Sequence, residues 1–235
     1  MLIKKECLFT DEDGKVNCID TEIYPEARYG RPGEPREKRK KATPEQVAAQ
    51  NARNREKRIW RYLKQNFRKG DYWLTLTYRK DERPADMDTV KGHVRRFLSR
   101  LRYAYKRMEK ECRYMYSIEL GSRGGVHIHM CLNALEGILK KMQDLWGYGH
   151  VNITLIYDEG NLKKLAAYLS KANVYNRSRN LVFPRIRKKK LSGSRLPRDP
   201  KAYKGFYVEK ESVEEGINPF SLLPWLHYIQ NRLKT

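Results

Sequence analysis

The pattern of hydrophobic and polar positions predicts three strands in the middle of the chain. Apolar and polar residues alternate over residues 115–120 and again over Val126–Leu132, with a glycine-rich segment of five residues between the two runs. Glycine accepts the positive φ angles of a tight reversal, so we expect these runs to form a β-hairpin. Residues 72–78 (YWLTLTY) alternate in the same way and predict a further strand.

Elsewhere the apolar positions recur every three to four residues, which is the period of an amphipathic helix. This pattern predicts helices over residues 44–67, 88–110, 135–146 and 161–176, with a strand over 151–157. The first helix begins with a capping box, in which Thr43 precedes Pro44 and is followed three residues later by Gln46. The order of elements predicts an α+β fold, with helices packed on one face of an antiparallel sheet.

The two ends of the chain show weaker patterns. Residues 1–24 suit one or two edge strands, and residues 25–41 are rich in proline, glycine and charge, which predicts a loop or a disordered arm. Near the C-terminus we expect a basic flexible segment over 185–201, a short strand over 205–208 and a capped helix over 218–233. These patterns predict a central domain over 44–180, an N-terminal extension and basic linker over 1–43, and a basic C-terminal extension over 181–235 that packs on the domain.

One face of the predicted hairpin carries a carboxylate and two imidazoles. With the hairpin symmetric about Arg123, Glu119 lies opposite His127, and His129 lies opposite Ser117. Directly opposed side chains are ~5 Å apart and diagonal ones ~7–8 Å, so Glu119, His127 and His129 can converge on one cation. Two imidazoles and a carboxylate suit a divalent metal such as Mn²⁺ or Mg²⁺, with positions left open for a phosphate. The alternative is a pair of histidines that only satisfy each other on a polar sheet face.

The helix predicted over 161–176 carries a reactive side chain beside its apolar stripe. Lys164, Tyr168, Lys171 and Tyr175 follow one another at spacings of four, three and four residues. Tyr168 and Lys171 are therefore neighbours on one helical face. A free phenol has a pKa of ~10, and a lysine one turn away favours the phenolate or compensates charge in a transition state. We expect Tyr168 to attack phosphorus with the help of Lys171, whereas Tyr175 is either a second nucleophile or a stacking or packing residue.

Composition narrows the class of partner. The chain has 235 residues and a net charge of +22, from 50 Lys and Arg against 28 Asp and Glu, as expected of a protein that binds a polyanion. Its 16 tyrosines and 4 tryptophans favour nucleic acid over a membrane surface, because aromatic rings stack on unpaired bases. The sequence shows no membrane-spanning run, no signal peptide and no CxxC spacing among its 4 cysteines. We therefore expect a cytoplasmic protein without a zinc site, a disulfide framework, a membrane partner or a small-molecule cofactor.

Three motifs resemble those of one enzyme family. His127-Ile128-His129 resembles the histidine–hydrophobic–histidine motif of HUH endonucleases, and Tyr168-Leu169-Ser170-Lys171 resembles their Tyr-x-x-Lys motif. Residues 72–78 resemble the strand that forms the family's first motif. The order strand, hairpin and tyrosine helix is that of rolling-circle replication initiators from bacterial plasmids and phages. The resemblance covers residues 72–176, and it implies an RRM-like sheet of about five strands with the tyrosine helix across its second face.

The resemblance also implies an activity and a set of partners. Such a protein nicks and joins single-stranded DNA at a replication origin, often exposed on a hairpin, and leaves a 5′-phosphotyrosine and a free 3′-OH. We expect the 3′-OH to prime a host DNA polymerase, and we expect a host helicase to unwind the duplex because the chain is too short for a helicase domain of its own. The residues expected to contact nucleic acid are Thr75, Thr77, Arg123, Lys164, Tyr175, Arg53, Arg58, Arg187, Lys188 and Lys189.

Two other functions fit part of the pattern. A single-tyrosine transposase of the same superfamily also has its tyrosine after the two histidines, but its helix commonly carries glutamine where Lys171 lies. A non-catalytic module that binds single strands on the same sheet face would show strong salt dependence and would form no covalent product. The replication initiator is the function that uses Glu119, both histidines and Tyr168 together.

Overall fold

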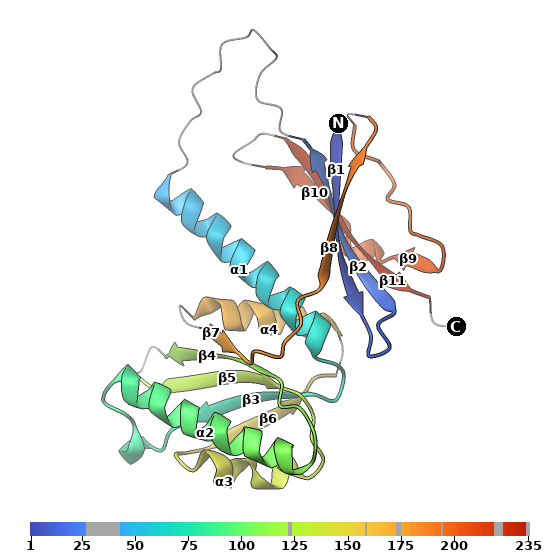
Figure 1. Cartoon of the computed structure of the whole chain (residues 1–235). Helices are drawn as coiled ribbons and strands as arrows, with labels where there is room; N and C mark the ends of the chain where they lie inside the picture. The colour runs from blue at the N-terminus through green and yellow to red at the C-terminus, as the bar shows by residue number, and fades with distance from the viewer. Residues whose placement is uncertain are drawn as a thin grey trace. The chain divides into compact units, whose positions relative to one another are not determined.

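The computed structural model describes residues 1–26, 43–121, 124–157, 159–172, 175–193, 195–218 and 223–233. The chain forms two compact units, one of residues 50–183 and one that combines residues 1–49 with 184–235. Each unit contains an antiparallel sheet, and the predicted α+β fold is confirmed (Figure 1). Residues 27–41 of the predicted N-terminal loop lie outside the described residues. In the described part of the chain, no helix combines the length and the apolarity needed to cross a bilayer.

The unit of residues 50–183 contains a five-stranded antiparallel sheet with the order β6-β3-β5-β4-β7. Its strands are β3 (Tyr72–Thr77), β4 (Tyr114–Leu120), β5 (Val126–Leu132), β6 (Val151–Leu155) and β7 (Tyr175–Arg177). The predicted hairpin thus lies in the middle of the sheet, and the predicted first strand is its neighbour. Residues on alternate positions of these strands point to opposite faces, and each face has a separate role.

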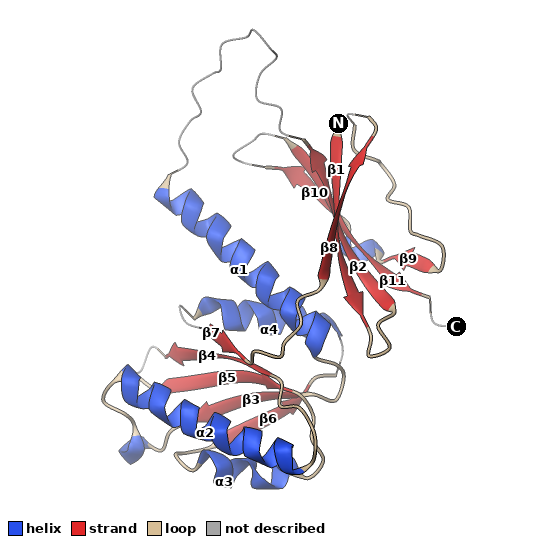
Figure 2. Ribbon diagram, viewed as in Figure 1, coloured by secondary structure: helices blue, strands red, loops and turns tan. Residues whose placement is uncertain are grey.

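One face of this sheet is the hydrophobic core of the unit. It packs against α2 (Met87–Arg107), which begins at the N-cap Asp86, and against α3 (Met142–Trp146) with the 3₁₀ turns Lys80–Glu82 and Ile138–Lys141 nearby. Leu74 and Ile128 of the sheet are fully buried in this core with Phe97 of α2. Figure 2 shows α2 across this side of the strands, as the amphipathic pattern predicts.

A close backbone approach fixes the end of β3 against the segment after α3. Trp146 donates its indole N–H to the carbonyl of Thr77, 2.8 Å away. A Cβ atom added at Gly149 would lie 2.1 Å from that same carbonyl oxygen and 2.7 Å from the Cα atom of Tyr78. Only glycine allows this approach, so Gly149 sets the position of the strand end that carries Thr77.

Two further helices complete the elements of the central sequence. Helix α1 (Pro44–Asn66) begins with the predicted capping box, in which the amide of Thr43 donates to Gln46 Oε1 and the amide of Gln46 donates to Thr43 Oγ1. Helix α4 (Glu159–Lys171) lies over the second face of the five-stranded sheet. It is shorter than the predicted helix over 161–176, and the reason is given with the candidate site below.

The second unit contains a six-stranded sheet that the sequence pattern did not predict. Its order is β10-β11-β2-β1-β8, and β9 also pairs with β11. Its elements are β1 (Leu2–Thr10), β2 (Val16–Pro25), β8 (Arg185–Leu191), β9 (Phe206–Val208), the 3₁₀ turn Lys210–Ser212, β10 (Glu214–Ile217) and β11 (Pro224–Arg232). Strands from both chain ends therefore pair side by side, as in the upper part of Figure 1.

Three predictions for the chain ends need correction. Residues 1–24 form two strands as expected, but these are interior strands, because β1 pairs with β2 and β8 and β2 also pairs with β11. The helix predicted over 218–233 is wrong, since Pro224–Arg232 is a strand whose backbone bonds go to its neighbours. The first seven residues of the segment predicted to be flexible form β8. The short strand predicted over 205–208 is confirmed as β9.

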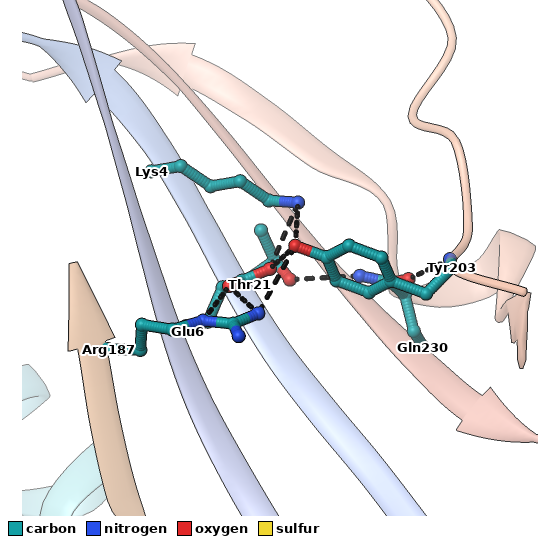
Figure 3. Close-up of polar contacts among 6 residues, drawn as sticks. All are labelled: Lys4, Glu6, Thr21, Arg187, Tyr203 and Gln230. Atoms are coloured by element: carbon teal, nitrogen blue, oxygen red, sulfur yellow. Dashed lines mark hydrogen bonds and ion pairs between the residues drawn. The ribbon is translucent and has the colours of Figure 1, made fainter. Parts of the chain in front are cut away.

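A buried charge cluster links one face of the six-stranded sheet to the loop before β9. Glu6 is 1% exposed, and its carboxylate accepts hydrogen bonds from Arg187 at 2.7 and 2.9 Å and from the hydroxyl of Tyr203 at 2.7 Å (Figure 3). Lys4 Nζ lies 2.9 Å from the same carboxylate. The amide of Tyr203 also donates to the side chain of Gln230, 2.9 Å away. Burial would raise the pKa of Glu6, but these hydrogen bonds outweigh it and lower the pKa below its ordinary value.

Candidate active site

The candidate site is built on the hairpin of β4 and β5. Glu119 lies opposite His127 and Ser117 lies opposite His129, so the predicted register is confirmed. These four side chains share one face of the five-stranded sheet because directly opposed residues of an antiparallel pair point the same way. It is the face opposite the core formed with α2.

The hairpin turn leaves space for the first histidine. The amide of Gly121 donates to the carbonyl of Gly125, 2.8 Å away, and closes the turn. A Cβ atom at Gly121 would lie 3.2 Å from that carbonyl and 3.5 Å from the ring of His127. A larger residue there would therefore crowd the imidazole. Arg123, which the sequence predicts to contact nucleic acid, lies outside the described residues.

Strand β3 places two threonines beside the histidines. Thr75 lies opposite His129, and Thr77 lies opposite His127. The hydroxyl of Thr75 is 3.2 Å from Nδ1 of His129, whereas the hydroxyl of Thr77 donates to the carbonyl of His150, 3.2 Å away. Thr75 thus holds the orientation of the His129 ring. Contact of either threonine with nucleic acid stays a prediction.

Glu119 and His129 form the closest acidic–basic pair of the site. Oε2 of Glu119 lies 3.3 Å from Nε2 of His129. Burial lowers the pKa of His129, although the carboxylate of Glu119 acts in the opposite direction. In the tautomer in which Nδ1 donates to Thr75, Nε2 turns a lone pair toward the carboxylate. Two acceptors at this distance repel each other unless a proton or a cation lies between them, so the pair is suited to share a cation.

The donor set fits a divalent metal in residue type. Two imidazoles and a carboxylate are common ligands of such ions, and all three side chains lie on one sheet face. The side chains are not gathered around one point, however. Among the described residues, no group of three or more His, Cys, Asp or Glu side chains is close enough together to hold a metal ion. A metal held by Glu119, His127 and His129 therefore stays a proposal.

Stacked rings hold His129 from two sides. The ring of Trp73 is nearly parallel to the ring of His129, with centroids 5.7 Å apart, and the ring of His127 is parallel to it at 6.2 Å. Stacking of this kind restrains the rotation of a side chain. Sequence reasoning missed Trp73, although its place two residues before Thr75 puts it on the same face of β3.

Helix α4 brings the predicted nucleophile to this face. The ring of Tyr168 lies 6.2 Å from the ring of His129 and 6.4 Å from the ring of Trp73. Nζ of Lys171 lies 4.9 Å from the centre of the Tyr168 ring, so the predicted neighbourhood of these two side chains is confirmed. The opposite side of the helix is fixed by Leu169, which is fully buried, whereas Tyr168 is 50% exposed. The tyrosine is therefore open to a ligand and close to the histidines.

The predicted position of Tyr175 is wrong. Helix α4 ends at Lys171, and Tyr175 begins the short strand β7, in which it lies opposite Ser117 of β4. The free edge of β4 offers backbone hydrogen bonds that helical spacing in the sequence cannot reveal, and these bonds outweigh the helical preference. Tyr175 is thus separated from Tyr168 in secondary structure but shares the sheet face of the candidate site.

Ser117 is a buried polar group of this face that no hydrogen bond satisfies. It lies between His129 of β5 and Tyr175 of β7, and it is 1% exposed. Its hydroxyl finds no partner among the described residues. Buried hydroxyls are seldom left without a partner, so an unsatisfied one beside the histidines points to a bound group. The sequence placed Ser117 opposite His129 but gave it no role.

The remaining predicted contacts to nucleic acid lie in three places. Arg53 and Arg58 are exposed on α1, and Lys164 is exposed on α4. Arg187, Lys188 and Lys189 belong to β8, an edge strand whose first six side chains are all exposed. Arg187 is engaged with Glu6, whereas Lys188 and Lys189 form no ion pair with the described residues. Their contact with nucleic acid stays a prediction.

The four cysteines are buried and free, and none is at the centre of the site. Cys131 shares the sheet face with the histidines, but it is fully buried opposite Trp73 and Met115. Burial raises the pKa of its thiol well above the ordinary value. This environment suits a packing residue and not a metal ligand.

Comparison with known proteins gives one positive result. Residues 71–173 match the model of a family of replication-associated proteins described under the name ORF2. No curated protein and no solved structure matches the chain significantly. The matched segment begins just before β3 and ends after α4, so it contains Glu119, both histidines, Tyr168 and Lys171. The match supports a role in the initiation of replication.

Proposed function

We propose that this chain is a rolling-circle replication initiator that nicks and rejoins single-stranded DNA at an origin through a covalent bond to Tyr168. The observation that carries the proposal is the place of the Tyr168 ring, 6.2 Å from the ring of His129 on the face that also holds Glu119 and His127. The match to a family of replication-associated proteins covers all four residues and supports the same function.

The proposed reaction is a phosphoryl transfer without loss of the bond energy. The phenolic oxygen of Tyr168 attacks the phosphorus of a DNA phosphodiester, and a new phosphorus–oxygen bond joins the 5′ phosphate to the tyrosine. The bond from phosphorus to the preceding 3′ oxygen breaks, and that oxygen leaves as a 3′-OH carrying the proton that the phenol gave up. A 3′-OH can later attack the phosphotyrosine, which reverses the step and rejoins the strand.

Lys171 and Ser117 would assist this transfer. Nζ of Lys171 lies 4.9 Å from the centre of the Tyr168 ring, so its positive charge favours the phenolate that attacks phosphorus. The buried hydroxyl of Ser117 has no partner in the described residues, and a phosphate oxygen beside His129 would supply one. These two groups bind and orient the phosphate without being consumed.

Glu119, His127 and His129 would hold a divalent metal ion, for which we propose Mn²⁺ or Mg²⁺. The facing acceptors of Glu119 and His129, 3.3 Å apart, support a cation at this place. When bound, such an ion would draw charge from the non-bridging phosphate oxygens. Thr75 and Trp73 would keep the ring of His129 in position for it.

The proposal names single-stranded origin DNA as the substrate, and a host helicase and a host DNA polymerase as partners. A nick supplies the 3′-OH from which a polymerase extends, and continued extension requires the parental duplex to be unwound. The half-exposed Tyr168 on an open sheet face suits an extended single strand, since such faces bind unpaired bases through aromatic rings.

A covalent-adduct assay tests the proposal. The protein is incubated with Mn²⁺ and a pool of random-sequence single strands carrying a label, and the products are separated on a denaturing gel. We expect a labelled protein band for the wild type and none for Tyr168→Phe or in the presence of a chelator. Tyr175→Phe is the matched control, because it removes another tyrosine hydroxyl from the same sheet face.

The outcomes separate the functions. A band that needs both Tyr168 and the metal supports nicking and joining. Tight binding of single strands without any band would favour a non-catalytic binding module. A band that survives Tyr168→Phe and disappears in Tyr175→Phe would assign the nucleophile to β7 and overturn the assignment made here.

A further inference from the structure

The first part of helix α1 extends away from any core. None of its residues from Pro44 to Arg58 is buried, whereas Ile59 and Leu63 of the same helix are fully buried. The exposed part is nevertheless well formed. The capping box closes its start, and the side chain of Gln50 donates to that of Asn54 one turn later, 3.0 Å away. Because the buried turns anchor the helix, the exposed turns need no core of their own to stay helical.

The exposed turns sort their side chains onto two faces. Ala48 and Ala52 continue the buried stripe upstream from Ile59 at spacings of four and seven residues, and the acidic Glu56 follows Ala52 by four. On the other face, Gln50, Arg53, Asn54 and Lys57 follow at positions i, i+3, i+4 and i+7. One face therefore presents amides and cations without an acidic residue.

The charge of this region is available to a partner. Arg53, Arg55 and Arg58 form no ion pair with the residues that the structure describes. Between Gln50 and Arg58 four cations accompany a single acid, Glu56, in a chain whose net charge is +22. Exposed cations that lack acidic partners attract a polyanion.

The composition of the exposed turns argues against a protein or a membrane as the partner. Val47 is the only side chain larger than alanine among the apolar residues from 45 to 58, and it is 45% exposed. A helix that docks in a protein groove or in a bilayer surface needs several large apolar anchors at spacings of three and four residues. A duplex nucleic acid needs none, because phosphates and base edges bind cations and amides.

We propose that the exposed half of α1, centred on Gln50–Arg58, lies in the major groove of duplex DNA. A helix with its side chains is ~10–12 Å wide, which matches the ~12 Å width of that groove. Arginine pairs with guanine edges or phosphates, and glutamine and asparagine pair with adenine edges. Arg53, Arg55 and Arg58 supply the affinity, and Gln50 and Asn54 read the sequence. This duplex site is separate from the single-strand site and does not depend on the nicking chemistry.

Fluorescence anisotropy with a labelled duplex of mixed sequence tests the affinity. The variant R53Q/R55Q/R58Q removes three cations from α1. The matched control K106Q/R107Q/K110Q removes three exposed cations at the end of α2, where we propose no DNA contact. At low salt we expect at least tenfold weaker binding for the α1 variant and less than twofold change for the control. The slope of log affinity against log salt should also fall by about 0.9 for each arginine that contacts a phosphate.

Groove and sequence are tested separately. A duplex selected from a random pool is methylated at guanine N7, which projects into the major groove, and we expect this to inhibit binding. A minor-groove ligand such as netropsin should not displace the protein. In Gln50→Ala/Asn54→Ala, the preference for the selected duplex over the mixed one should fall about tenfold.

Several results would overturn the inference. These are equal losses in the two triple variants, an unchanged affinity in the α1 variant, no binding of duplex by the wild type, or displacement by the minor-groove ligand. The covalent-adduct assay on single strands, run on the same α1 variant, keeps the two proposals apart. We expect that variant to retain the adduct, and the absence of an adduct in the wild type would count against nicking alone.

Discussion

The two sheets of this protein treat their buried polar groups in opposite ways. In the six-stranded sheet, the carboxylate of Glu6 is surrounded by Lys4, Arg187 and Tyr203, which satisfy it (Figure 3). In the five-stranded sheet, Glu119 faces a nitrogen of His129 at 3.3 Å and the hydroxyl of Ser117 has no partner in the described residues. A satisfied cluster holds a structure together, whereas unsatisfied groups on an open face mark a place for a ligand.

The same contrast holds for the aromatic residues near these groups. Tyr203 donates its hydroxyl to Glu6 and its amide to Gln230, so it is tied to the sheet at two points. Tyr168 is held beside the histidines by its helix and by ring contacts, and half of its side chain is open to solvent. A tyrosine that is bound on all sides supports a fold, and a tyrosine that is exposed beside ionisable groups is available for chemistry.

The largest expected effect breaks the five-stranded sheet and leaves the other sheet intact. In Gly149→Ala, the new Cβ would collide with the backbone of Thr77 and Tyr78, so β3 has to shift. We expect the free energy of unfolding to fall by about 3 kcal/mol or more. Hydrogen exchange should show lost protection in β3 and β5 but not in β1 and β2. Gly92→Ala is the control, because nothing lies within 4 Å of its Cβ and alanine favours the helix.

The next variant breaks the six-stranded sheet and leaves the candidate site intact. Glu6→Gln removes the charge that pairs with Lys4 and Arg187, so two cations lose their partner. We expect a loss of about 3 kcal/mol, seen as lost hydrogen-exchange protection in β1, β2 and β11. Glu26→Gln, which breaks the more exposed pair with Lys190 in the same unit, should cost less than about 1 kcal/mol. Equal effects in the two variants would show that burial of the Glu6 cluster has no special weight.

A third variant probes the support of His129 without breaking either sheet. Thr75→Val keeps the shape of the side chain but removes the hydroxyl that lies 3.2 Å from Nδ1. We expect the rate of adduct formation to fall about 10-fold to 100-fold, with little change in the thermal midpoint. Thr77→Val is the control, since its hydroxyl bonds to a backbone carbonyl and not to a histidine. A rate unaffected by Thr75→Val would remove this threonine from the site.

The smallest expected effect is a pH dependence that belongs to the six-stranded sheet alone. The pKa of Glu6 is lower in the folded state than the ordinary value of about 4.3. Its contribution to stability is therefore complete above about pH 5 and is lost as the pH falls through the lowered folded pKa. The difference in unfolding free energy between wild type and Glu6→Gln should shrink over that range, by on the order of 1 kcal/mol. A difference that stays constant down to about pH 3 would contradict the lowered pKa.

Much of the five-stranded sheet could be predicted because its information is local. The hairpin of β4 and β5 needs only alternation and a glycine-rich turn, and these fix the pairing of Glu119 with His127. The spacing of Tyr168 and Lys171 on a helix is equally local. In each case the partners are close in sequence, so the pattern alone specifies the geometry.

The six-stranded sheet could not be predicted in the same way. Its strand β1 pairs with β8, which lies almost the whole length of the chain away, and β11 pairs with β2. The apolar residues of 218–233 also recur at spacings that suit a helix, and only the backbone bonds offered by the neighbouring strands make Pro224–Arg232 extended. Pairing over such separations depends on the assembled fold, which short-range periodicity does not encode.

The sequence by itself determined the α+β class, the hairpin with its carboxylate and two histidines, and the tyrosine helix. These follow from the period of apolar positions and from turn and cap residues, which act within a few residues. The tertiary structure decided that Tyr168 lies against His129, that Trp73 and Thr75 support this histidine, and that Tyr175 belongs to a strand. It also joined the chain ends in one sheet around Glu6, because contacts between distant segments form only when the chain is folded.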